Sequence, residues 1–214
     1  MTTRVKICGM KTRSTMAAAL AAGADYVGLV FFAKSPRNVA LAAAAELAEQ
    51  ARGRAQIAAL LVDPSQALVA EVLAAIRPDY LQLHGHETPQ RAAEIRAASG
   101  CRILKAIPIS TRDDANVALR YNAVAEILFD TKPPPGADLP GGNGSAFDWG
   151  LLDGIRKQMP FMLSGGLTVS NVVTAIAVCA PDAVDVSSGV ESAPGEKDEA
   201  LIKQFIFASK LAGR

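Results

Sequence analysis

Two turns rich in glycine and serine near the end of the chain have the composition of an anion-binding site. Ser164-Gly165-Gly166 follows the apolar run Phe161–Leu163, and Ser187-Ser188-Gly189 follows the run Ala183–Val186. Backbone N–H groups are unshielded in such turns, and the N-terminus of a following helix adds a partial positive charge. Many (β/α)8 barrels bind a substrate phosphate with such turns after strands seven and eight. The residues expected to form this site are Gly165, Gly166, Ser187, Ser188 and Gly189.

Two other side chains have a type and a position suited to proton transfer. Cys8 follows the first expected strand, and Asp130 follows the apolar run Ile127–Phe129. The cysteine is either a small buried residue or a reactive thiol. Lys6, two residues earlier, either activates that thiol or forms an ion pair inside the fold. The aspartate either caps the next loop or acts as a general acid whose pKa is raised by partial burial.

Further polar residues follow other expected strands. The guanidinium of Arg37, in Ser35-Pro36-Arg37, could bind a carboxylate with two hydrogen bonds or form a surface salt bridge. Asp185 could accept hydrogen bonds from sugar hydroxyls. His84 and His86 are two residues apart on a loop without a third ligand, so they predict no metal site. We expect His84 to be a hydrogen-bonding wall residue and His86 to be solvated.

These residues need elements that bring them together, and the chain alternates short apolar runs with alanine-rich helical stretches. Apolar runs without alternation are typical of parallel strands buried on both faces. The expected strands are Arg4–Ile7, Tyr26–Phe31, Gln56–Val62, Tyr80–Leu83, Arg102–Ile107, Glu126–Phe129, Phe161–Leu163 and Ala183–Val186. The expected helices are Ser14–Ala22, Leu41–Ala51, Ser65–Ile76, Thr88–Ala98, Arg112–Leu119, Phe147–Gln158, Val169–Cys179 and Glu196–Leu211.

This order predicts a single-domain (β/α)8 barrel over residues 1–214. The competing architecture, a doubly wound open sheet, usually needs fewer strands, and no GxGxxG follows the first strand. A weak internal repeat supports the count, because an aspartate stands just before three of the strands, at Asp25, Asp79 and Asp182. In a barrel, polar residues at the carboxyl ends of strands are the catalytic candidates.

The segment from Thr131 to Ala146 interrupts this alternation, with Pro133-Pro134-Pro135-Gly136 and Pro140-Gly141-Gly142-Asn143-Gly144. It is either a linker between domains or a functional loop on the active face. The residues from Phe147 onward contain two expected strands, too few to fold alone. We therefore expect a lid that closes over a bound ligand.

Composition excludes several kinds of partner. The chain has 22 Lys and Arg against 21 Asp and Glu, a formal net charge of +1, and no basic patch that predicts nucleic-acid binding. We expect no membrane association, because no apolar run could span a bilayer and the N-terminus does not resemble a signal peptide. The cysteines Cys8, Cys101 and Cys179 are odd in number and far apart, which argues against disulfides and predicts a cytoplasmic protein.

Several of these motifs, taken in order, resemble those of the phosphoribosylanthranilate isomerase family and extend from residue 4 to residue 191. They are Lys6-Ile7-Cys8-Gly9, Phe31 with Ser35-Pro36-Arg37, Gln82-Leu83-His84-Gly85, Phe129-Asp130-Thr131-Lys132, Gly141-Gly142-Asn143-Gly144 with Phe147-Asp148-Trp149, Ser164-Gly165-Gly166-Leu167 and Val184–Glu191. The chain departs from the family at Asn143, where threonine is more frequent, and at Asn38, which is often aromatic.

The resemblance implies a cofactor-free Amadori rearrangement in tryptophan biosynthesis. It makes Cys8 the general base and Asp130 the general acid, with Arg37 on the anthranilate carboxylate and the glycine turns on the phosphate. The expected partner is a small phosphosugar, and we expect a monomer or a homodimer. Two alternatives remain: a related phosphosugar isomerase, which carries aspartate where Cys8 stands, and a non-enzymatic barrel, which needs neither Cys8 nor Asp130.

Overall fold

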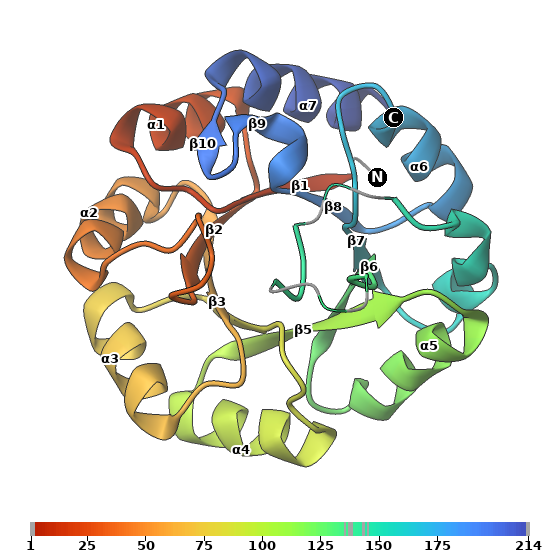
Figure 1. Cartoon of the computed structure of the whole chain (residues 1–214), viewed down its shortest axis with the longest axis horizontal. Helices are drawn as coiled ribbons and strands as arrows, with labels where there is room; N and C mark the ends of the chain where they lie inside the picture. The colour runs from red at the N-terminus through yellow and green to blue at the C-terminus, as the bar shows by residue number, and fades with distance from the viewer. Residues whose placement is uncertain (1–2, 135, 137–138, 143, 145, 213–214) are drawn as a thin grey trace.

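Eight parallel strands close into a barrel, and helices surround it (Figure 1). The computed structural model describes residues 3–134, 136, 139–142, 144 and 146–212. The barrel strands are β1 (Arg4–Cys8), β2 (Tyr26–Phe31), β3 (Gln56–Leu61), β4 (Tyr80–Leu83), β5 (Arg102–Ile109), β6 (Glu126–Thr131), β7 (Phe161–Leu163) and β8 (Ala183–Val186). Each strand pairs with the next, and β8 pairs with β1 to close the ring. The predicted (β/α)8 barrel is confirmed.

The outer layer is formed by helices that follow the strands. They are α1 (Arg13–Ala22), α2 (Leu41–Ala51), α3 (Gln66–Ile76), α4 (Pro89–Ser99), α5 (Arg112–Val117), α6 (Val172–Cys179) and α7 (Glu199–Ala212). Hydroxyl side chains cap several helix N-termini by accepting a hydrogen bond from the first turn, which satisfies a donor that has no partner within the helix. The capping residues are Thr12, Ser65, Thr88 and Thr111.

The predicted helix Phe147–Gln158 is wrong. The segment instead forms two short 3-10 turns, η2 (Trp149–Leu152) and η3 (Ile155–Lys157). Gly154 between them has a φ of 84°, a left-handed conformation that interrupts a helix. The predicted start of a helix at Val169 is also too early, because α6 begins at Val172 after a turn.

The predicted start of the last helix at Glu196 is wrong for a different reason. Residues before α7 form an antiparallel hairpin of β9 (Glu191–Ala193) and β10 (Glu196–Lys197). Gly195, in the turn between them, has a φ of 82°. A Cβ at this position would lie 2.5 Å from the carbonyl oxygen of Pro36, so glycine lets the hairpin approach the loop after β2.

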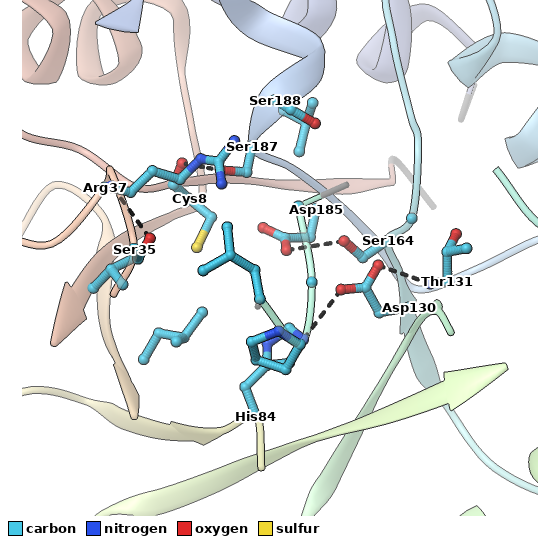
Figure 2. A pocket seen from close by; sticks show the side chains of 18 of the residues that line it. Cys8, Ser35, Arg37, His84, Asp130, Thr131, Ser164, Asp185, Ser187 and Ser188 are labelled. Carbon is cyan, nitrogen blue, oxygen red and sulfur yellow. Dashed lines mark hydrogen bonds and ion pairs between the residues drawn. The ribbon is translucent and has the colours of Figure 1, made fainter. Parts of the chain in front are cut away.

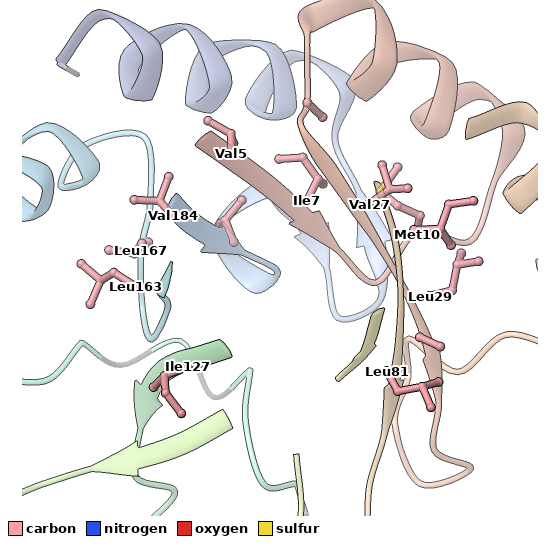
Figure 3. Packing of buried hydrophobic residues seen from close by; sticks show 14 of the residues in the cluster. Val5, Ile7, Met10, Val27, Leu29, Leu81, Ile127, Leu163, Leu167 and Val184 are labelled. Atoms are coloured by element: carbon pink, nitrogen blue, oxygen red, sulfur yellow. The ribbon is translucent and has the colours of Figure 1, made fainter. Parts of the chain in front are cut away.

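Apolar residues form two layers of core. The larger layer lies between the strands and the helices, where residues such as Val5, Ile7, Val27 and Leu29 are fully buried (Figure 3). The smaller layer is a ring of side chains, and their positions alternate along the strands with those of the larger layer. Its members are Tyr26, Ala58, Tyr80, Leu104, Ala106, Leu128, Met162 and Ala183. Because side chains alternate across a strand, this second set faces the barrel interior.

The repeated aspartates close the amino-terminal rim of the barrel. Each stands before one strand and accepts a hydrogen bond from a backbone N–H of the neighbouring strand. The pairs are Asp25 with Val5 at 2.8 Å, Asp79 with Ile57 at 2.7 Å and Asp182 with Phe161 at 3.1 Å. The weak repeat in the sequence therefore has a structural cause: the same carboxylate cap is used for β1, β3 and β7.

Candidate active site

A cavity opens at the carboxyl ends of the strands, the face on which (β/α)8 barrels carry their active sites. Residues from distant parts of the chain line it, and they include most of those predicted from the sequence: Cys8, Arg37, Asp130, Gly165, Gly166, Asp185, Ser187 and Ser188. Gly189 is not among the lining residues. A Cβ on Gly189 would lie 1.9 Å from the carbonyl oxygen of Leu167, so this glycine lets the loops after β7 and β8 touch.

Cys8 is the last residue of β1, and its side chain points into the barrel (Figure 2). Gly28 on β2 makes room for it, since a Cβ there would lie 2.7 Å from Sγ. The side chain is enclosed, because Cys8 is only 3% exposed. Burial raises the pKa of the Cys8 thiol above its ordinary value, and the charge of nearby Lys6 opposes this shift.

Lys6 forms an ion pair inside the barrel, the second of the two alternatives left open by the sequence. Its Nζ lies 2.9 Å from Oδ1 of Asp185, and both side chains are buried. Burial works against the charged ammonium, but the contact with Asp185 outweighs it and raises the pKa of Lys6. Ser164 donates a hydrogen bond to the other oxygen, Oδ2, at 3.2 Å. Asp185 is thereby fixed between Cys8 and the glycine turns (Figure 2).

Asp130 lies near the end of β6, on the far side of the cavity from Cys8 (Figure 2). Its Oδ1 accepts a hydrogen bond from the backbone N–H of Thr131 at 2.8 Å, and its Oδ2 lies 3.1 Å from Nε2 of His84. Nδ1 of His84 lies 3.2 Å from Nε2 of Gln82. An amide NH2 can only donate, so Nδ1 accepts and Nε2 carries the proton that faces Asp130. His84 thus holds one carboxylate oxygen, as a wall residue was expected to do.

The turn after β7 has a backbone that only glycine adopts readily. Gly165 and Gly166 have φ values of 87° and 60°. A Cβ on Gly165 would lie 2.4 Å from Oγ1 of Thr131, so the turn packs against the end of β6. Asn171 stabilises the turn, because its Nδ2 donates a hydrogen bond to the carbonyl oxygen of Gly166 at 3.0 Å.

The turn after β8 leads into a 3-10 turn, η4 (Ser188–Val190), and not into an α-helix as expected. Oγ of Ser187 donates to the carbonyl oxygen of Cys8 at 3.1 Å. Nζ of Lys197 donates to the carbonyl oxygen of Ser187 at 3.0 Å. The turn is therefore fixed by β1 on one side and by the β9–β10 hairpin on the other.

Arg37 makes a buried contact rather than the surface salt bridge considered from the sequence. Its Nε and Nη2 donate to the two carboxylate oxygens of Glu191, at 2.8 and 2.9 Å. Gly9 follows Cys8 and lets the Arg37 stem pack closely, since a Cβ there would lie 2.9 Å from Cδ of the arginine.

The expected lid lies partly outside the described residues, and so does Asn143. The part that is described lies over the cavity: Leu139, Pro140, Gly141 and Gly142 are among its lining residues. A Cβ on Gly141 would lie 2.6 Å from Oδ2 of Asp130 and 2.7 Å from Nε2 of His84. The backbone of this segment therefore contacts the Asp130–His84 pair directly.

Three functional candidates were missed in the sequence. Gln82 belongs to a motif but received no role, because its contact with His84 depends on how their side chains turn. Glu191 also belongs to a motif, yet its partner Arg37 is 154 residues away. Lys197 was placed in an expected helix, and no spacing signal marks it. Among the residues that the structure describes, no group of three or more His, Cys, Asp or Glu side chains could hold a metal ion.

Fold and site together indicate a class, the (β/α)8-barrel enzymes that act on a small molecule at the carboxyl ends of the strands. Acid and base candidates face each other across one cavity, and backbone turns suited to an anion form part of its wall.

Comparison with known proteins identifies the family. The family model of N-(5'-phosphoribosyl)anthranilate isomerase matches residues 5–208. The chain therefore belongs to the N-(5'-phosphoribosyl)anthranilate isomerase family. The isomerase of that name from Rhodopseudomonas palustris strain BisA53 is 54% identical over 211 residues, which cover 98% of this chain and 97% of the relative. Its counterpart from Mesorhizobium japonicum is 50% identical over 209 residues, covering 97% of this chain and 95% of the relative.

Solved structures agree. The phosphoribosyl anthranilate isomerase of Thermotoga maritima matches with a TM-score of 0.88 and 35% identity, covering 97% of this chain and 98% of that chain. A phosphoribosyl anthranilate isomerase in complex with reduced 1-(o-carboxyphenylamino)-1-deoxyribulose 5-phosphate matches with a TM-score of 0.85 and 34% identity, over the same shares. No helix within the described part of the chain is long and apolar enough to cross a membrane.

Proposed function

We propose that the chain catalyses the Amadori rearrangement of N-(5'-phosphoribosyl)anthranilate to 1-(2-carboxyphenylamino)-1-deoxyribulose 5-phosphate, a step of tryptophan biosynthesis. The observation that carries the proposal is the placement of Cys8 and Asp130 on opposite sides of one buried cavity (Figure 2). Two proton-transfer groups that do not contact each other can act on different atoms of one substrate.

The reaction begins at the acid. Asp130 donates a proton to the ribose ring oxygen, the bond between C1 and that oxygen breaks, and the nitrogen lone pair forms a C1=N iminium. Asp130 is then a carboxylate, and the hydrogen bonds from His84 and from the N–H of Thr131 stabilise its charge.

The base acts next. The Cys8 thiolate removes the proton from C2, and the electrons of that C–H bond form the C1=C2 double bond of an enolamine as the iminium is neutralised. The enolamine loses its O–H proton and gains one at C1, which gives the ketone. The iminium itself accepts the electrons, so proton transfer suffices and no cofactor is required.

Activation of the thiol is part of this proposal. In the free protein, burial holds the pKa of Cys8 above its ordinary value, which favours the protonated thiol. The iminium introduces a positive charge into the cavity, and a positive charge near a thiol favours the thiolate. The thiol proton passes to solvent, so the base is formed when the substrate has already been opened, and Asp130 regains a proton from solvent before the next turnover.

Binding roles follow from the same cavity. The backbone N–H groups of Gly165, Gly166 and Ser188, which line the cavity, bind the phosphate, with Ser187 supporting the turn after β8. Asp185 accepts hydrogen bonds from the sugar hydroxyls. Arg37 binds the anthranilate carboxylate with the side of the guanidinium that Glu191 does not use.

A fluorescence assay tests the activity by following the loss of phosphoribosylanthranilate generated in situ. Cys8→Ala and Asp130→Asn should each lower kcat by roughly 10²–10⁴-fold. Cys101→Ala is the matched control, because Cys101 contacts Pro78 outside the cavity and should leave kcat unchanged. No activity in the purified protein, or near-normal kcat in Cys8→Ala, would contradict the proposal.

We also propose a cytoplasmic location and a monomer or homodimer. Support for the location is the absence of disulfides among Cys8, Cys101 and Cys179, which are free. One Thermotoga maritima relative is described as dimeric, with monomers generated from it. Cell fractionation tests the location, and sedimentation equilibrium tests the assembly state.

A further inference from the structure

The carboxylate partner of Arg37 comes from the hairpin after β8. Glu191 accepts hydrogen bonds from Nε and Nη2 of Arg37, and the two side chains are only 4% and 8% exposed. A bidentate contact of this kind fixes the plane of the guanidinium. Nη1 lies on the side that faces Gly142 in the cavity wall, because a Cβ on Gly142 would lie 2.6 Å from it.

A second cation contacts the same carboxylate. Nζ of Lys197 lies 2.5 Å from Oε1 of Glu191, and its side chain is 1% exposed. Burial opposes the ionisation of Glu191, but the hydrogen bonds from Arg37 and the charge of Lys197 outweigh it and lower its pKa to about 2. Glu191 is therefore ionised at neutral pH. Lys197 is not among the residues that line the cavity, so it acts on a ligand through its neighbours.

The charges of these three side chains do not cancel. Arg37 and Lys197 are cations and Glu191 is an anion, which leaves one net positive charge. Without Lys197 the remaining pair would be neutral. A ligand carboxylate that approached Arg37 would then also approach an uncompensated carboxylate, and charges in buried surroundings are weakly screened.

We propose that Lys197 is a specificity-determining residue, which neutralises Glu191 and so leaves the charge of Arg37 available to the carboxylate on the aromatic ring of the substrate. The inference rests on the proposed function, in which Arg37 binds that carboxylate. It gives Lys197 a charge-balancing role beyond its hydrogen bonds to Ser187.

The test compares two ligands by calorimetry. One probe is reduced 1-(o-carboxyphenylamino)-1-deoxyribulose 5-phosphate, and the other is its phenyl counterpart, which lacks the ring carboxylate. The unmodified protein should bind the carboxylated probe more tightly. Lys197→Met should weaken binding of that probe at least tenfold more than binding of the phenyl probe, because the lost hydrogen bonds to Ser187 affect both probes alike. Lys203→Met, at an exposed position of α7, is the matched control and should leave both Kd values unchanged.

Two further variants separate charge from packing. Lys197→Gln retains a donor for Ser187 but not the charge, so it should show the same selective loss and replaces Lys197→Met if that variant does not fold. The double variant Glu191→Gln with Lys197→Met leaves Arg37 as the single charge of the three. It should recover most of the tenfold loss, because the net positive charge is restored.

Other outcomes would overturn the inference. If both lysine variants weaken the two probes equally, the ammonium serves the Ser187 turn and not the carboxylate. If neither variant changes the preference, charge balance at Glu191 is irrelevant. Arg37→Gln distinguishes this failure from failure of the proposed function. If Arg37→Gln loses the preference for the carboxylated probe while the Lys197 variants keep it, only the role of Lys197 is contradicted. If Arg37→Gln keeps that preference, carboxylate binding by Arg37 itself is contradicted.

Discussion

His84 and Asp130 face each other with Nε2 and Oδ2 3.1 Å apart, and both side chains are almost fully buried. The contact joins the end of β4 to the end of β6 across the cavity wall. It gives the proposed acid a neighbour that stabilises its conjugate base. The tautomer of His84 depends in turn on Gln82, whose amide donates to Nδ1.

Removing this support should slow the reaction without preventing binding. His84→Ala is expected to lower kcat by roughly tenfold or more, because a hydrogen bond to a charged group contributes about 1.5–3 kcal/mol. KM should change much less, since the carboxylate charge forms only as the proton is transferred. His86→Ala is the matched control, because His86 is almost fully exposed. Steady-state kinetics of the two variants test this prediction. An equal fall in kcat for both variants would assign His84 a structural role only.

The raised pKa of Cys8 predicts a pH dependence. Because burial disfavours the thiolate, the ionised fraction of Cys8 in the free protein should continue to rise above about pH 8.5, the ordinary thiol pKa. Stability should change in the opposite direction. A group whose pKa is raised by folding stabilises the native state below its unfolded pKa, and this stabilisation is lost as pH rises towards the folded pKa.

Cys8→Ser isolates that effect. The loss of unfolding free energy between pH 7 and pH 10, measured with urea, should be smaller in the variant than in the unmodified protein. Identical stability losses in the two proteins would mean that Cys8 does not titrate as inferred.

Gly166 should be required for phosphate binding rather than for folding. Gly166→Val is expected to raise KM strongly, because a branched side chain would strain a residue with a φ of 60° and shield the N–H groups of the turn. Gly53→Val is the control, since Gly53 has a φ of 73°, no neighbour within 4 Å of a Cβ, and a place far from the cavity. A similar rise of KM in both variants would show that strain alone is responsible.

Glu191 should make stability sensitive to acid. Its pKa is lowered by folding, so its stabilisation is present above its ordinary pKa of 4.5 and is lost as pH falls towards about 2. This stabilisation contributes on the order of 3 kcal/mol to the free energy of unfolding. Glu191→Gln should lose less stability than the unmodified protein between pH 5 and pH 2.5, measured by urea unfolding. Glu196→Gln, exposed on the same hairpin, should behave like the unmodified protein.

The aspartate caps should affect stability alone. Asp79→Ala leaves the N–H of Ile57 without its side-chain acceptor and should lower the free energy of unfolding by about 1–3 kcal/mol. The residue lies at the rim opposite the cavity, so kcat and KM should be unchanged at a temperature where the variant is folded. A fall in kcat in fully folded protein would contradict this separation.

The strands could be predicted from the sequence because each is an apolar run buried on both faces, and β2, β4, β7 and β8 have the predicted bounds. The helix at Phe147 could not be excluded, since the break depends on the left-handed backbone of Gly154. The hairpin before α7 was missed because its turn, at Gly195, follows a strand of three residues. Periodicity describes long regular elements, and these features are short.

The candidate site likewise has a part that could be predicted from the sequence and a part that could not. Residue type and strand position were enough to select Cys8, Asp130 and Asp185, because the carboxyl ends of parallel strands must meet. Contacts between loops were not predictable. The Arg37–Glu191 pair joins segments 154 residues apart, and it depends on how closely Gly9 and Gly195 let the chain approach.

The carboxylate caps on β1, β3 and β7 lie at the rim of the barrel farthest from the chemistry. Changes to the loops that recognise a substrate are often destabilising, and a protein tolerates them only while a margin of stability remains. Because these caps provide part of that margin without contacting the cavity, the barrel can accept new loop sequences after its strands. If Asp25, Asp79 and Asp182 are replaced by alanine in the parent protein, a library of its loop variants should therefore contain fewer folded members. These three residues thus influence how readily the chain acquires a new specificity.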